Sequence, residues 1–160
     1  MKFEHLIEIN DPLNPLVDVL TRDQIWRGLV LRAEAPMLFV PHLDDCRLFD
    51  RSPNAVSRSL RYGELVIEDR VEFLPQQEIR YLVAAQKDIA ESSLMMTIEE
   101  PEPDVFFVRF EYDDGNDPAT DAANAMYNDF RRSAYEESDI DTIRIIRQLA
   151  QEGRFKVPLA

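Results

Sequence analysis

The sequence predicts a single α+β domain over residues 1–160, in which a curved antiparallel sheet of about seven strands is flanked by a long C-terminal helix. Two observations lead to this fold class. Alternating apolar and polar segments separated by turn residues fill the middle of the chain, and a helical pattern fills its last third. Short connections between consecutive strands favour an antiparallel meander. A chain of 160 residues without repeats or a low-complexity linker is in the range of one domain.

The first elements are a strand and a short helix. Residues 2–9 alternate apolar and polar side chains, which is typical of a half-buried strand. Thr21 and Gln24 have the spacing of a capping box that opens a helix. Pro36 is expected to end this helix, because proline disfavours helical geometry in the residue before it.

Six further strands, joined as hairpins, are expected between residues 44 and 113. Each is short, alternates in hydrophobicity and is bounded by glycine, proline or asparagine. The expected strands are 46–50, 56–61, 64–74, 78–84, 94–98 and 105–112.

The last third of the chain predicts one long helix, with Asp117 as its N-cap and Gly153 just past its end. One stripe of this helix is predicted to face the sheet: Ala123, Tyr127, Phe130 and Ala134. Beyond Ser138 the apolar positions move around the helix. Either the helix kinks near 136–139, or its last turns pack on a different surface.

The charge excludes several partners. The chain has 31 acidic and 18 basic residues, a net charge of −13, and fourteen of the acids lie in residues 99–141. Nucleic acids and anionic membranes are poor partners for such a chain, because both attract clustered cations. No apolar stretch reaches the length of about 20 residues that a spanning helix needs, and no signal region is expected at the start. Cys46 is the only cysteine, which favours a reducing cytoplasm.

Catalytic and metal-binding motifs are not found in the sequence. His5, His42 and Cys46 lack the spacing of known metal sites, and the glycine-rich phosphate loops and the nucleophile elbow are missing. We therefore expect no metal or other cofactor, and we assign no catalytic residue.

Two polar side chains fall on predicted inward faces of neighbouring strands. Asp69 shares a face with Ile67 and Val71, and Arg58 shares a face with Val56 on the strand before. The hairpin between them brings the two close together. They are either a polar handle inside an apolar pocket or a structural ion pair, unless a β-bulge turns both toward solvent.

A resemblance to a known family extends over nearly the whole chain. It rests on His5-Leu6-Ile7-Glu8-Ile9-Asn10, Trp26-x-Gly28-Leu29-x-x-Arg32-Ala33-x-x-Pro36-x-x-Phe39-Val40-Pro41, Tyr62-Gly63, Ala134-Tyr135, Asp139-Ile140-Asp141-Thr142 and Gly153-Arg154. With its order of elements, the chain resembles the START-like (SRPBCC) helix-grip superfamily, which includes polyketide cyclases. Within it, the chain is most similar to the family named after a protein of the acetylaranotin biosynthesis cluster. The resemblance implies a sheet wrapped around the last helix and a hydrophobic ligand held between them.

Three hypotheses follow for function. The leading one is a binder of a small hydrophobic, lipid- or polyketide-like molecule. The second is a cyclase or dehydratase-type enzyme, with Asp69 or a tyrosine as acid–base group and Arg58 as its electrostatic partner. The third is an acidic protein-interaction module with a plain core, and a homodimer is left open. The predicted ligand-binding residues are Trp26, Arg58, Asp69, Met96, Phe110, Tyr127, Phe130 and Ala134.

Overall fold

The computed structural model describes residues 1–87 and 89–155. Its centre is a seven-stranded antiparallel sheet in the order β1-β7-β6-β5-β4-β3-β2. The strands are β1 (Lys2–Glu8), β2 (Asp45–Ser52), β3 (Ala55–Tyr62), β4 (Leu65–Leu74), β5 (Glu78–Val83), β6 (Ser92–Glu102) and β7 (Val105–Asp113). The predicted meander is confirmed, and β1 extends it at one edge by pairing with β7.

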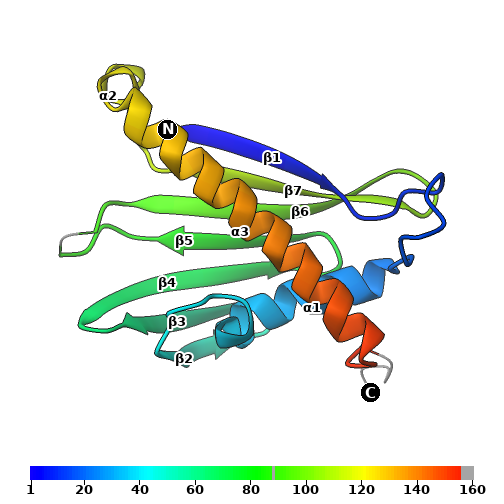
Figure 1. The fold of residues 1–160 in the computed structure, drawn as a ribbon. Helices are drawn as coiled ribbons and strands as arrows, with labels where there is room; N and C mark the ends of the chain where they lie inside the picture. The colour runs from blue at the N-terminus through cyan, green and yellow to red at the C-terminus, as the bar shows by residue number, and fades with distance from the viewer. Residues whose placement is uncertain (88, 156–160) are drawn as a thin grey trace.

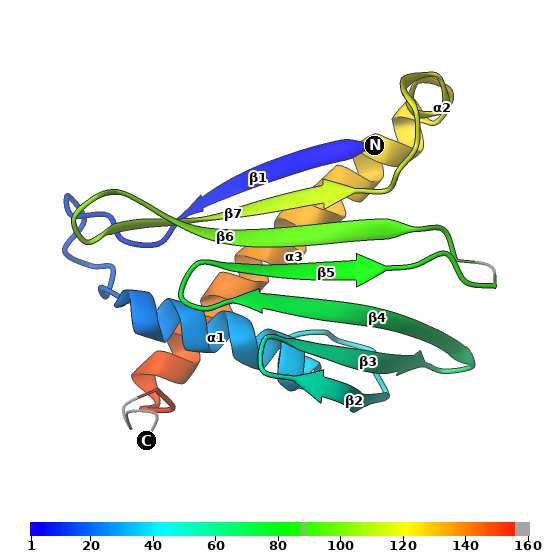
Figure 2. The ribbon, with the colours of Figure 1, turned by 180° about the vertical axis from the view of Figure 1, so that it is seen from behind.

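The helices are α1 (Arg22–Glu34), the short 3-10 helix η1 (Pro36–Leu38), α2 (Pro118–Ala123) and α3 (Ala125–Gln151). Helix α3 crosses one face of the sheet diagonally, and it lies behind the strands when the molecule is turned round (Figures 1 and 2). The core lies between this face, α1 and the C-terminal half of α3.

Local sequence chemistry explains most element boundaries. The Thr21 side chain accepts from the Gln24 backbone, and the Gln24 side chain accepts from the Thr21 backbone, so the predicted capping box is present. Helix α1 ends at Glu34, and Pro36 begins η1 instead of continuing the helix. At the other end, Gly153 adopts φ +79°, the left-handed conformation of a helix C-terminus.

Most strand boundaries lie within two residues of the prediction, and two larger differences remain. Strand β6 continues past Ile98 to Glu102, because a register shift between Glu99 and Glu102 accommodates Pro101. The expected single last helix is divided at Asn124, whose φ and ψ of −110° and 22° are not helical. Asp117 caps α2 as predicted.

The predicted orientation of the last helix is wrong. Tyr127 and Phe130 are 64% and 75% exposed, and Ala123 and Ala134 are also exposed. The opposite side of α3 faces the sheet, and there the buried side chains are Asn128, Asp139, Thr142, Ile143, Ile146 and Leu149. The helix continues through 136–139. Its C-terminal turns pack on the core, whereas the stripe with Tyr127 and Phe130 faces solvent.

Candidate functional site

A cavity of about 380 Å³ lies between the concave face of the sheet, the N-terminal half of α3 and the segment from α1 to Val40. This volume is in the usual range for small-molecule sites. Aromatic and basic residues are prominent in its lining, which comprises Met1, Arg32, Pro36, Val40, Arg58, Leu60, Tyr62, Tyr81, Val83, Ser92, Ser93, Leu94, Tyr112, Asp113, Asp114, Arg131 and Tyr135.

Arg58 and Asp69 form a buried ion pair at one wall of the cavity. They are directly opposite each other on β3 and β4. Arg58 Nε donates to Asp69 Oδ1 at 2.9 Å, and Nη2 donates to Oδ2 at 2.6 Å. The remaining Nη1 donates to the carbonyl of Ala33 at the end of α1. Burial opposes the charge of Arg58, but the bonds to Asp69 outweigh it and raise the pKa of the guanidinium.

The inward orientation predicted for both residues is confirmed, because each is less than 9% exposed. Asp69 uses both carboxylate oxygens on Arg58, so it is not available as a free acid or base. Between the functional and structural alternatives, the geometry favours a structural pair, one member of which also lines the cavity.

Two guanidinium groups lie near the ring of Tyr81. The Cζ atom of Arg58 is 4.9 Å from the centre of its ring, and that of Arg32 is 5.4 Å from it, both within cation–π range. Tyr81 is only 5% exposed, and its hydroxyl has no hydrogen-bond partner among the residues that the structure describes. A buried hydroxyl without a partner is costly.

Arg32 reaches the cavity from the last turn of α1. Its Nε donates to the hydroxyl of Thr142 on α3 at 3.2 Å. Thr142 in turn donates that hydroxyl proton to the carbonyl of Ser138. Within residues 1–87 and 89–155, no carboxylate lies within 4 Å of the Arg32 guanidinium.

An aromatic stack forms the wall beside β1 and β7. The rings of Tyr112 and Tyr135 are nearly parallel, with centres 4.0 Å apart. Phe3 extends the stack from β1, 6.1 Å from Tyr112. Such a wall offers flat, polarisable surface to an aromatic ligand.

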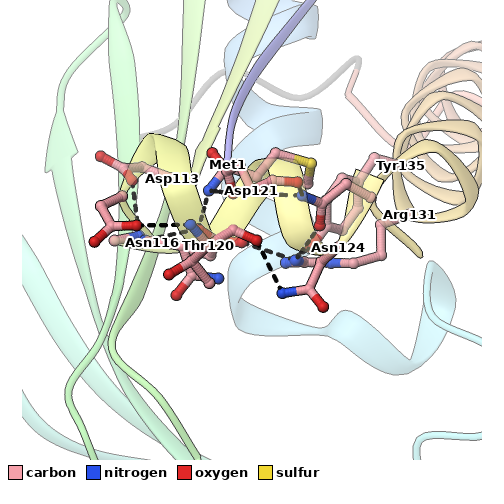
Figure 3. Close-up of polar contacts among 12 residues, drawn as sticks. Met1, Asp113, Asn116, Thr120, Asp121, Asn124, Arg131 and Tyr135 are labelled. Carbon is pink, nitrogen blue, oxygen red and sulfur yellow. Dashed lines mark hydrogen bonds and ion pairs between the residues drawn. The ribbon is translucent and has the colours of Figure 1, made fainter. Parts of the chain in front are cut away.

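Polar contacts connect the N-terminal end of α3 to the start of the chain and to the segment after β7 (Figure 3). Arg131 donates to Asp114 at 2.7 Å and to the Tyr135 hydroxyl at 3.0 Å. The amino group of Met1 contacts Asp114 and lies 2.7 Å from Asp121. These contacts join β1, the end of β7 and both helices at the rim of the cavity.

A second polar chain runs from the cavity into α3. The Tyr112 hydroxyl donates to Asp139 Oδ1, and His5 Nδ1 lies 3.4 Å from Oδ2. Burial raises the pKa of Asp139 to about 6, although the bonds from Tyr112 and His5 and the charge of Arg32 oppose this. Burial and the charge of Asp139 raise the pKa of Tyr112 well above its usual value.

Only some of the predicted site residues meet at the cavity. Arg58 lines it, and Asp69 supports Arg58 from behind. Trp26, Met96 and Phe110 are buried in the core cluster and do not line the cavity. Tyr127, Phe130 and Ala134 lie on the solvent side of α3, as described above. The prediction that this stripe lines the cavity is therefore wrong.

Sequence reasoning missed three central residues. Tyr81 alternates with Ile79 and Val83 on the inward face of β5, so the strand periodicity could have identified it. Arg32 and Asp139 fall within the motifs that carry the family resemblance, but their role depends on contacts between segments that are far apart in the chain. His5 and Asp139, for example, are 134 residues apart. Periodicity does not reveal such contacts.

The described part of the chain contains no group of three His, Cys, Asp or Glu residues that could hold a metal ion. None of its helices is long and apolar enough to cross a membrane.

Comparison with known proteins gives one family and several similar folds. Residues 7–153 match the model of the family described as acetylaranotin biosynthesis cluster protein L (AtaL). A comparison with curated proteins gives no significant match.

Among solved structures, the di-domain aromatase/cyclase StfQ of the steffimycin biosynthetic pathway has a TM-score of 0.68 at 14% identity, covering 96% of this chain and 52% of its own. The di-domain aromatase/cyclase BexL of the BE-7585A pathway has a TM-score of 0.63 at 16% identity, covering 92% and 49%. This chain thus spans about half the length of each. The Zhui aromatase/cyclase from Streptomyces sp. R1128 has a TM-score of 0.59 at 10% identity, covering 94% and 93%. The likeness shows the predicted helix-grip fold.

Proposed function

We propose that this chain, which belongs to the family of acetylaranotin biosynthesis cluster protein L, binds a small aromatic, largely hydrophobic molecule in the cavity under α3. The observation that carries the proposal is the cavity itself. It has the volume of a small-molecule site and a wall of stacked tyrosines, with polar groups at one side. The names of the similar structures, which are aromatase/cyclases, support an aromatic or polyketide-like ligand.

The arrangement of charges supports a ligand site over a plain core. An ordinary core excludes charged side chains, yet three arginines reach this space: Arg32, Arg58 and Arg131. Their desolvation is tolerated next to a cavity that solvent or a polar ligand can enter. The third hypothesis, an interaction module with a plain core, does not account for this placement.

The test uses a neutral fluorescent probe, N-phenyl-1-naphthylamine, which gains fluorescence in apolar surroundings. We expect saturable binding by the unmodified protein. Val83→Phe places a larger side chain into the cavity and should reduce binding several-fold. Leu82→Phe is the matched control, because neighbouring residues of a strand point to opposite faces of the sheet. No saturable binding, or equal loss in both variants, would refute the proposal.

Native mass spectrometry of the purified protein would then identify the molecule. A co-purifying small molecule that is lost in Val83→Phe and kept in Leu82→Phe would give the ligand directly. Its mass and fragmentation would also decide between a lipid-like and an aromatic compound.

A second candidate, a dehydratase or cyclase-type enzyme, is favoured by the chain Tyr112–Asp139–His5. A carboxyl with a pKa of about 6 can exchange protons near neutral pH. Asp139 is fully buried and bonds to the hydroxyl of Tyr112, which lines the cavity, so Tyr112 would pass protons between them. Loss of water from the β-hydroxy ketone 4-hydroxy-4-phenylbutan-2-one gives a conjugated enone that absorbs in the ultraviolet. The enzyme hypothesis requires a rate above that of buffer, and this excess should disappear in Tyr112→Phe.

The proposal extends to the setting of the protein. We propose a cytoplasmic location from the single cysteine, and neither nucleic acid nor an anionic membrane as partner, because the net charge is −13. Whether two copies associate is a question for analytical ultracentrifugation.

A further inference from the structure

The three arginines of the cavity differ in how their charges are balanced. Arg58 has the carboxylate of Asp69 and uses all of its nitrogens in hydrogen bonds. Arg131 has the carboxylate of Asp114 and the hydroxyl of Tyr135. Arg32 makes one hydrogen bond, through Nε to Thr142, and within the described ranges it has no carboxylate within 4 Å. Its charge is therefore the least compensated of the three.

The bond to Thr142 fixes which edge of the Arg32 guanidinium is available. Thr142 donates its hydroxyl proton to Ser138, so its oxygen is left to accept from Arg32 Nε. The two terminal nitrogens point away from this bond and present two N–H groups side by side. That edge matches the two oxygens of a carboxylate.

Solvent reaches these terminal nitrogens. Across the part of the chain that the structure describes, Tyr81 Oη is the one fully buried side-chain nitrogen or oxygen without a partner. The unpaired nitrogens of Arg32 are thus not fully buried, and Arg32 lines the cavity. Asp139 is close enough for its carboxyl to feel the charge of Arg32, but its oxygens face Tyr112 and His5.

The ring of Tyr81 supports the Arg32 guanidinium at the same place. Tyr81 also lines the cavity, and Arg32 Cζ lies 5.4 Å from the centre of its ring. The Tyr81 hydroxyl is fully buried, so the contact with a ligand in the cavity is left to Arg32. Arg32 and Tyr81 come from α1 and β5, so the fold brings the cation and the ring together from separate elements.

We propose that the cavity selects an aromatic carboxylate, whose two oxygens bind the terminal nitrogens of Arg32. This inference rests on the proposed function, because it specifies the ligand of the same cavity. The aromatic part of the ligand lies toward Tyr112 and Tyr135, and its carboxylate lies toward α1.

Two ligands of the same shape test the inference. 2-Naphthoate carries the carboxylate, and 2-naphthamide replaces it with a neutral amide. Titration calorimetry near neutral pH should give at least about tenfold tighter binding of the carboxylate, since hydrogen bonds to charged groups are stronger than neutral ones. Arg32→Met should remove this preference and leave both ligands with similar affinity.

Arg47→Met is the matched control. It removes the same charge from an exposed position on β2 that does not line the cavity, so the preference for 2-naphthoate should remain. Tyr81→Phe is the second control. It deletes a hydroxyl that a ligand in the cavity does not reach and keeps the ring beside Arg32, so both the fold and the preference for 2-naphthoate should be kept.

The outcomes separate the two proposals. Binding of N-phenyl-1-naphthylamine by Arg32→Met shows that its cavity is intact. If 2-naphthoate and 2-naphthamide bind the unmodified protein equally, or if Arg32→Met keeps the preference, the inference is overturned and the proposed function stands. If neither these ligands nor the neutral probe bind, both are overturned.

Discussion

In its C-terminal half, α3 presents branched apolar side chains to α1 and the sheet, whereas in its N-terminal half it presents polar and aromatic ones. Ile143 and Ile146 belong to the closed core. Arg131, Tyr135 and Asp139 contact the sheet through hydrogen bonds and stacking, and the cavity lies beside them. We call residues 125–139 of α3 its open half, because the cavity lies beside them, and residues 140–151 its closed half, because they pack against the core.

The difference follows from how closely each half can approach its neighbours. Gly28 on α1 has no side chain, and a Cβ built there would lie 2.6 Å from Ile146 Cγ2. The missing side chain of Gly28 therefore allows α1 and α3 to pack directly against each other. At the N-terminal end of α3, long polar side chains reach the sheet and contact it only through the polar groups at their tips. Interiors pack densely when branched apolar groups interlock, and polar bridges leave room between them.

The largest expected effect concerns the buried Arg58–Asp69 pair at the wall of the cavity. Arg58→Met leaves Asp69 buried without its partner and should lower the free energy of unfolding by about 3–5 kcal/mol. The double variant Arg58→Met with Asp69→Leu removes both charges and should recover much of this loss. Urea unfolding of the single variants and the double variant measures it. Small and additive effects would mean that the pair does not maintain the cavity wall.

The second prediction concerns the buried carboxyl of the open half. An unfolded aspartic acid titrates near 3.8, whereas Asp139 in the fold keeps its proton up to about 6. Between these values the folded state binds more protons, so this group lowers stability as the pH rises through that window. Above pH 6 the ionised Asp139 lowers the free energy of unfolding by about 3 kcal/mol. Asp139→Asn should therefore gain stability relative to the unmodified protein as the pH rises from about 4 to 7.

The matched control for this prediction is Asp129→Asn, which removes a carboxylate from an exposed position on the same helix. Its effect should stay within about 0.5 kcal/mol. Chemical unfolding of both variants across the pH range gives the comparison. An unchanged stability difference for Asp139→Asn at all pH values would contradict a raised pKa at this site.

The third prediction tests the closed half. Gly28→Ala places a methyl group against Ile146 and should cost about 1–2 kcal/mol, because overpacking outweighs the better helix propensity of alanine. In an Ile146→Ala background the same change should be neutral or stabilising. Probe binding should be unaffected, since neither residue lines the cavity. Equal effects of Gly28→Ala in both backgrounds would indicate that the helices do not meet here.

Local patterns predicted the fold because strand alternation, turn residues and caps act over a few residues. The Arg58–Asp69 pair was predictable for the same reason, since the hairpin turn at Tyr62-Gly63 fixes the register of β3 and β4. The cavity required longer-range information. Arg32, Tyr81 and Asp139 come from three separate elements, and only their tertiary arrangement shows that Arg32 has no carboxylate within 4 Å among the described residues.

The apolar stripe of α3 was assigned to the wrong side for a related reason. Hydrophobic periodicity assumes that the buried face of a helix is apolar. In the open half of α3 the buried face contains Asn128 and Asp139, which are satisfied by hydrogen bonds, and apolar Tyr127 and Phe130 face solvent. Where a helix buries polar residues, its apolar stripe no longer marks the side that faces the core.

The smallest expected effect confirms which side of α3 faces the sheet. Ala134 is exposed, so Ala134→Leu should change the free energy of unfolding by no more than about 0.5 kcal/mol. Leucine is also a good helix former, so the helix itself should tolerate it. Binding of N-phenyl-1-naphthylamine should stay the same, in contrast to its loss in Val83→Phe. Destabilisation by about 1–3 kcal/mol, the usual cost of overpacking, would place Ala134 against the sheet and contradict the orientation described here.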